Sequence, residues 1–140
     1  MITKLRKRIE SEKGFTLIEM LIVIIILGIL IAIAVPAYLK FRDNANKGAA
    51  QANIRATIPA MENYNADNIG TATDADANAT TSGYDGMTVA LLQAIDPAIK
   101  SSPAFTIISE GTAAYCVSAK SGPFTYYKDE STDISTTACT

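Results

Sequence analysis

The chain has 140 residues, a net charge of −2 and no histidine or tryptophan. It contains no Ser-His-Asp arrangement, no P-loop, no G-x-G-x-x-G and no H-E-x-x-H motif, so we expect no enzyme and no cofactor. Basic residues outnumber acidic ones before Gly14, so the rest of the chain is more acidic than the net charge indicates. This balance argues against a dedicated nucleic-acid surface, although nucleic acid stays open as a partner.

An apolar segment runs from Phe15 to Val35, directly after a basic stretch that ends at Gly14. Spanning a bilayer takes about 20 apolar residues, which this segment supplies. A secretory signal peptide has a shorter apolar region, of roughly 7–15 residues, although Ala32-Ile33-Ala34 offers a small-x-small pattern. One acid, Glu19, lies inside the segment. An acid there costs about 2.5–3.5 kcal/mol on insertion scales and by default marks a function.

The sequence Gly14-Phe15-Thr16-Leu17-Ile18-Glu19, between the basic stretch and the apolar segment, closely resembles the N-terminus of the type IV pilin family. The resemblance implies that a prepilin peptidase cuts between Gly14 and Phe15 on the cytoplasmic side. It also implies that Phe15, the new N-terminus, is N-methylated. A basic leader agrees with a cytoplasmic start under the positive-inside rule.

The same resemblance divides the chain into three parts. Residues 1–14 are expected to be a leader peptide, residues 15–38 a transmembrane and filament-core helix, and residues 39–140 a globular head. The precursor is then expected in the inner (cytoplasmic) membrane, and the mature chain in an extracellular surface filament.

Glu19 has a predicted role in subunit assembly. Cleavage before Phe15 creates an α-ammonium at the head of an apolar helix, where an unpaired buried charge is costly. We expect Glu19 of a neighbouring subunit to pair with this ammonium and to set the register of the filament. The resemblance implies the same pair, because pilins carry an acid at this place. The alternative is a carboxylate that extends to the lipid headgroups.

Apolar residues continue at spacings of three or four beyond Val35, which predicts a helix from Phe15 to about Asn68. The expected apolar face of its second half consists of Tyr38, Phe41, Ala45, Ala49 and Ala52, and it continues on a nearby face with Ile54, Ile58 and Met61. Proline favours a kink or a local opening, so Pro36 should disturb the helix, and Pro59 should kink it or end it early. Pilins commonly carry a glycine and a proline at the places of Gly28 and Pro36. The resemblance therefore implies a flexible stretch between these two residues, with a static kink as the alternative.

Small and turn-forming residues dominate from Ile69 to Gly86, which predicts a surface loop. Four oxygen-bearing residues of this loop fall at positions 1, 3, 5 and 12 of an EF-hand-type pattern: Asp74, Asp76, Asn78 and Asp85. Ala79 replaces the required glycine, so we expect no metal site and keep calcium only as a minor alternative. Asn78-Ala79-Thr80 also matches the N-glycosylation pattern, which often occurs by chance.

The remaining residues predict a short helix at 87–95 and β-strands at 104–109, 113–119 and 124–128, separated by hairpin signals. An antiparallel sheet of three or four strands packed on the second half of the long helix gives an α+β, pilin-like fold. Cys116 and Cys139 are expected to form one disulfide in an exported head. Two cysteines without histidine argue against a zinc site.

We interpret the chain as the structural subunit, a major pilin, of a type IV pilus. The implied partners are identical subunits in a helical homopolymer, the prepilin peptidase, an assembly platform protein and an ATPase. The alternative is a pseudopilin of a type II secretion or DNA-uptake system, which shares this N-terminus; the expected disulfide favours a pilin. A monomeric membrane-tethered binding domain is a third hypothesis, and it predicts no cleavage at Gly14.

Overall fold

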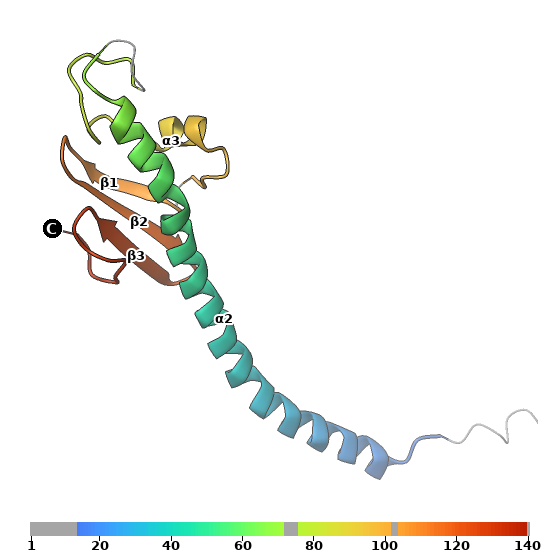
Figure 1. Ribbon diagram of the computed structural model, residues 1–140. Coiled ribbons are helices and arrows are strands. Elements are labelled where there is room, and N and C mark those ends of the chain that lie inside the picture. The colour runs from blue at the N-terminus through green and yellow to red at the C-terminus, as the bar shows by residue number, and fades with distance from the viewer. Residues whose placement is uncertain (1–13, 72–75, 102–103, 140) are drawn as a thin grey trace, which may run out of the picture. The chain divides into compact units, whose positions relative to one another are not determined.

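One long helix, α2 (Leu17–Asp67), is followed by a short helix, α3 (Val89–Ile95), and three strands (Figure 1). The computed structural model describes residues 14–71, 76–101 and 104–139. The chain divides into two units, one that ends at Phe41 and one from Arg42 to Thr140. The predicted α+β class is confirmed.

Helix α2 has 51 residues and continues without a break through Gly28, Pro36 and Pro59. The predicted local opening at the prolines, and the early helix end considered at Pro59, are therefore wrong. Both prolines are exposed, and each removes only one hydrogen bond from a ladder of many, which the rest of the long helix can sustain. Flexibility between Gly28 and Pro36 stays a prediction.

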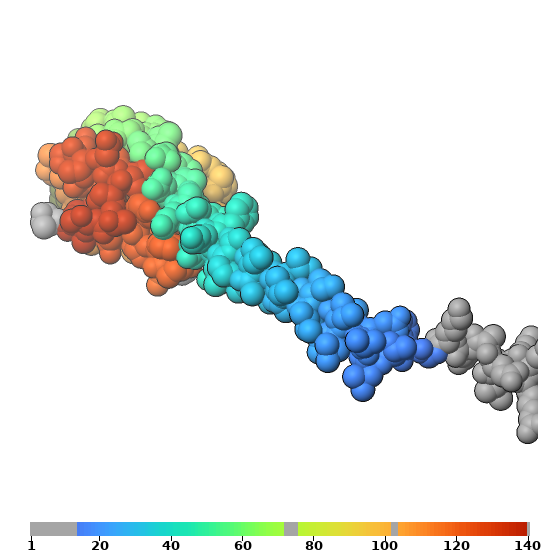
Figure 2. All heavy atoms as spheres, turned by 90° about the horizontal axis from the view of Figure 1, so that it is seen from below, coloured from blue at the N-terminus to red at the C-terminus, as the bar shows by residue number. Residues whose placement is uncertain are grey.

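The first unit leaves its apolar side chains uncovered. Every large apolar residue from Phe15 to Phe41 is exposed, with Phe15 at 81% and Leu17 at 83%. Figure 2 shows this segment, in blue, as a rod the width of one helix. By length and composition, α2 can cross a membrane. A surface of this kind has to be covered by lipid or by other protein chains.

The sheet of the second unit has the order β1 (Thr106–Glu110), β2 (Tyr115–Ser121) and β3 (Phe124–Asp129), and both pairs are antiparallel. The predicted strands agree with these bounds to within a few residues at each end. The described residues contain no fourth strand. Instead, the tail makes one isolated bridge to the sheet, in which Tyr127 and Ser135 exchange two backbone hydrogen bonds of 2.8 and 3.0 Å.

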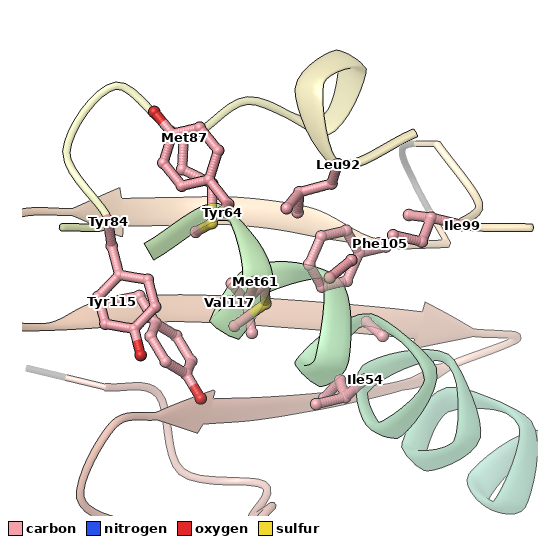
Figure 3. Packing of buried hydrophobic residues seen from close by; sticks show 12 residues of the cluster. Ile54, Met61, Tyr64, Tyr84, Met87, Leu92, Ile99, Phe105, Tyr115 and Val117 are labelled. Atoms are coloured by element: carbon pink, nitrogen blue, oxygen red, sulfur yellow. The ribbon is translucent and has the colours of Figure 1, made fainter. Parts of the chain in front are cut away.

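The core of the second unit lies between α2, α3 and the sheet. In Figure 3, Met61 of α2 lies next to Val117 of β2, and Phe105 lies between Leu92 and Ile99. All five side chains are almost fully buried. Burial of one such side chain contributes about 1.5–3 kcal/mol, so this cluster is a major source of stability for this unit.

The buried face of α2 differs from the predicted one. It consists of Ala50, Ile54, Thr57, Ala60, Met61 and Tyr64. Ile54 and Met61 were predicted correctly, but Ala45, Ala49 and Ala52 are exposed. The prediction took its phase from Tyr38 and Phe41. These two residues belong to the first unit and are exposed, so the face they define is not the one that meets the sheet.

A disulfide joins Cys116 of β2 to Cys139 of the tail, with Cα atoms 6.0 Å apart. The two residues are separated by 23 positions in the sequence, and closing a loop of this size contributes about 3 kcal/mol in the chain-entropy model. The irregular tail is thereby attached to the middle strand of the sheet.

The loop between α2 and α3 passes very close to the turn between β1 and β2. Tyr84 N donates to Gly111 O at 3.1 Å, and a Cβ added to Gly83 would lie only 1.9 Å from the backbone oxygen of Thr112. Gly83 also has a φ of +69°, which side chains disfavour. Only glycine fits at this crossing.

We predict that Gly83→Ala lowers the free energy of unfolding by about 2–4 kcal/mol, because the new methyl group meets backbone and the φ is strained. Thermal unfolding of the detergent-solubilised chain, followed by near-ultraviolet circular dichroism, measures this loss. The matched control is Gly48→Ala in α2, where an added Cβ meets nothing within 4 Å. That change should raise stability by about 0.5–1 kcal/mol. Equal effects at both positions would contradict the prediction.

Candidate functional site

Thr16 and Glu19 form a reciprocal cap at the start of α2. The amide and the hydroxyl of Thr16 donate to Glu19 Oε2 at 2.8 and 2.7 Å, and the Glu19 amide is 3.3 Å from Thr16 Oγ1. This arrangement is a capping box, which satisfies donors that the first turn of a helix leaves unpaired. The signal Thr-x-x-Glu is present in the sequence, but our sequence analysis assigned no role to Thr16.

The Glu19 carboxylate keeps binding capacity beyond this cap. Both bonds from Thr16 end on Oε2, so Oε1 has no partner among the described residues. The one ion pair found in the described ranges joins Arg42 and Asp43 at 3.7 Å, and it does not involve Glu19. Within its own chain, Glu19 is therefore hydrogen-bonded but its charge is not paired with a cation.

The peptide bond between Gly14 and Phe15 lies immediately before this cap. Both residues are exposed, and a Cβ added at Gly14 would meet nothing within 4 Å. Residues 1–13, which carry the basic part of the predicted leader, lie outside the described residues. The described geometry leaves this bond accessible from solvent.

Asn68 anchors the loop that leaves α2. Its side chain is buried, and Nδ2 donates to the carbonyl oxygens of Gly83 and Asp85 at 3.1 and 2.9 Å. The hydroxyl of Tyr64 donates to the same Asp85 carbonyl at 3.0 Å. These bonds hold both ends of the loop near the core. From the sequence, Asn68 was predicted only as the end of a helix, because the acceptors lie 15 and 17 residues away.

Asp74, one of the four residues considered for calcium, lies outside the described residues. The carboxylate of Asp76 accepts from the Asn78 amide at 2.9 Å and from the Thr81 hydroxyl. No group of three or more His, Cys, Asp or Glu side chains in the described part of the chain is placed to hold a metal ion. Calcium binding in this loop stays an untested alternative.

Tyr84 and Tyr115 form a buried aromatic pair, with ring centroids 4.9 Å apart and an interplanar angle of 68°. The Tyr84 hydroxyl donates to both oxygens of Glu62 at 3.1 Å. Burial, followed by the Glu62 hydrogen bond, raises the pKa of Tyr84 far above its usual range. Burial and the nearby charge of Glu130 raise the pKa of Tyr115 to about 12.

Comparison with known proteins identifies the N-terminal region first. Residues 11–35 match the model of the prokaryotic N-terminal methylation motif. This range includes the Gly14–Phe15 bond, the cap of Thr16 and Glu19, and the whole apolar segment from Phe15 to Val35.

Three curated relatives extend the comparison. The type IV wide pilus major component PilA4 of Thermus thermophilus is 34% identical over 113 residues, which are 79% of this chain and 74% of that protein. The type IV narrow pilus major component PilA5 of the same organism is 57% identical over 49 residues, which are 35% of this chain and 39% of that one. The type II secretion system core protein G of Pseudomonas aeruginosa is 42% identical over 59 residues, 42% of each chain.

The match to the wide-pilus component reaches well beyond the N-terminal helix and into the second unit, whereas the other two cover less than half of their relatives. Together with the α+β fold, this match shows that the chain belongs to the type IV pilin family. The resemblance expected from residues 14–19 is thereby confirmed.

We predict that the second unit loses stability as the pH rises from about 10 to 12. The unfolded tyrosines ionise near pH 10, whereas Tyr115 stays protonated to about pH 12 and Tyr84 beyond it. Above pH 10 the folded state therefore binds more protons than the unfolded state, and unfolding becomes easier. Tyrosinate absorbance during an alkaline titration should show late ionisation, to which Tyr84 and Tyr115 contribute, together with unfolding. Six tyrosines that all titrate near pH 10 in the folded chain would contradict this.

Proposed function

We propose that this chain is the major structural subunit of a type IV pilus, and that it polymerises through the first half of α2. The observation that carries this proposal is the uncovered apolar surface from Phe15 to Phe41. Its first turn contains Glu19, an acid whose charge is not paired within the described part of the chain. Such a surface is suited first to a bilayer and then to lateral packing with copies of itself. The wide-pilus relative, whose printed name is that of a major component, supports the same function.

In this proposal a prepilin peptidase removes residues 1–14 and exposes the amine of Phe15, which is then N-methylated. Residues 15–38 hold the precursor in the inner membrane and later form the filament core, while residues 39–140 form the exported head. A platform protein and a cytoplasmic ATPase would supply the work of extension. The family motif over residues 11–35 supports this processing.

Assembly would give the Glu19 carboxylate a second partner. In the single chain its Oε2 accepts from Thr16, and in the filament the carboxylate would also pair with the Phe15 ammonium of a neighbour. The free Oε1 offers a position for that ammonium. A flexible stretch between Gly28 and Pro36 would let the core helices adjust to one another.

The alternative function is a pseudopilin of a type II secretion or DNA-uptake system. The similarity to core protein G supports it, but that similarity covers only 42% of each chain. The pilin is favoured because the wide-pilus component matches 79% of this chain, and because the tail is attached by a disulfide. Deleting the gene for this chain separates the two functions. Loss of surface fibres with secretion intact would support the pilin.

The first test is the N-terminal mass of the chain recovered from material sheared off the surface of the producing cells. We expect a chain that starts at N-methylated Phe15, because the proposed cleavage precedes export to the filament. A chain found only in membranes and starting at Met1 would contradict the proposal and leave a tethered domain. A start at Val35 would indicate a secreted protein without its apolar segment.

Glu19→Gln separates the charge of Glu19 from its capping role. Glutamine still serves in a capping box, so the helix start is preserved, but the partner of the Phe15 ammonium is lost. We expect normal cleavage and a fall of surface filament by at least about a hundredfold, since breaking a buried ion pair costs about 3–5 kcal/mol. Filament in the sheared fraction, relative to chain in the membrane, measures the effect.

Thr16→Ala is the matched control. It removes the cap, at a cost of about 0.5–2 kcal/mol of helix stability, but keeps the carboxylate. This variant should assemble filaments far better than Glu19→Gln. The ion pair is refuted if Glu19→Gln assembles normally, and a helix-capping role alone is indicated if both variants fail equally.

A further inference from the structure

The triplet Asn78-Ala79-Thr80 is the sole Asn-x-Ser/Thr sequence in the chain, and x is not proline. It lies in the loop between α2 and α3, and all three residues are exposed. We propose that Asn78 is an N-glycosylation site, at which an oligosaccharide is attached to Nδ2. This inference rests on the proposed function in one respect, since export is what brings the loop to a sugar-transferring enzyme outside the cytoplasm.

The position of the triplet gives an enzyme access to it. Figure 1 shows the loop projecting past the last turn of α2. The residues on either side of Asn78 are alanines, which are exposed and have the smallest side chains after glycine. Ala77 has a φ of 57°, a left-handed conformation that turns the chain sharply just before Asn78. The asparagine therefore sits at an exposed turn without bulky neighbours in sequence.

The asparagine side chain has a defined orientation in this turn. The amide and the hydroxyl of Thr80 donate to Asn78 Oδ1 at 3.1 and 2.8 Å. The backbone of Asn78 is held as well. Its amide donates to the Asp76 carboxylate at 2.9 Å, and its carbonyl oxygen accepts from the Thr81 hydroxyl at 3.0 Å. No hydrogen bond within the described ranges engages Asn78 Nδ2. The oxygen is thus bound inside the turn while the nitrogen, the atom to be modified, is free.

The base of the loop is fixed independently of this exposed turn. Gly83 N donates to Asn68 O at 2.9 Å, and Tyr84 N donates to Gly111 O at 3.1 Å. These contacts, and not Asn78, connect the loop to the core. An attached sugar would therefore extend into solvent without displacing any buried group.

The reaction joins Asn78 Nδ2 to the anomeric carbon of a sugar donor, which we take to be an oligosaccharide linked to a lipid through a diphosphate. The carbon–oxygen bond to the diphosphate breaks, and the lipid diphosphate leaves with the bonding electrons. One proton of Nδ2 passes to a base of the transferase. The Thr80 hydroxyl is the second recognition element, which explains why the pattern requires a hydroxyl two residues after the asparagine.

The test is mass spectrometry of the full-length mature chain purified from the organism that produces it. Trypsin cuts after Arg55 and Lys100 and not between them, so Asn78 lies in the single peptide Ala56–Lys100. We expect this peptide to exceed its bare mass by a whole number of sugar residues. Fragmentation that preserves the sugar should place the addition on Asn78.

Matched variants identify the attachment site. Asn78→Gln and Thr80→Ala should return the peptide to its bare mass, whereas Thr80→Ser, which keeps the hydroxyl, should retain the sugar. Asn63→Gln changes an exposed asparagine outside the triplet and should leave the modification unchanged. An addition that persists in Asn78→Gln overturns the inference.

The N-terminus of the same sample separates this inference from the proposed function. A bare peptide on a chain that starts at Phe15 overturns the glycosylation site and leaves the pilin function intact. A bare peptide on a chain that still starts at Met1 overturns both.

Discussion

The apolar surface of residues 15–41 is the constraint on which the rest of the protein depends, because nothing in this unit covers it. A soluble chain could not carry so many uncovered leucine and isoleucine side chains without aggregating. Either a bilayer or other protein chains have to cover them, since both offer an apolar environment. The acid at position 19 lies inside this surface, and its charge is not paired with a cation within the described part of the chain.

The second unit has a small core, which forms between one face of α2, the short helix α3 and three strands. Helix α2 supplies small residues such as Ala50 and Ala60 beside larger ones such as Ile54 and Met61, so the sheet can approach closely. Asn68 and Gly83 then hold the long loop against the β1–β2 turn, and a disulfide holds the tail. In their described parts, the loop between α2 and α3 and the C-terminal tail therefore each have a specific attachment, which suits a domain with a small core.

Patterns that are local in sequence predicted most of this structure. The long helix, the three strands and the relation to pilins follow from apolar periodicity, turn residues and the six residues from Gly14 to Glu19. The helix face was wrong at Ala45, Ala49 and Ala52, because the phase of a helix against a sheet is set by tertiary contacts. The helix continues through Pro36 and Pro59, because each proline removes only one backbone hydrogen bond from a ladder of many. The bonds of Asn68 and the crossing at Gly83 join residues distant in sequence, which no local pattern reveals.

The attached tail has a consequence for the outer edge of the sheet. β3 is an edge strand, and an edge with unpaired backbone groups is a template for pairing with other chains. Ser135 occupies part of that edge through its bridge to Tyr127, and Cys139 ties the same tail to β2. The disulfide thus also acts as a safeguard against aggregation. If the cysteines were reduced, the tail would lose this attachment, and the backbone donors and acceptors of β3 would be open to pairing with strands of other chains.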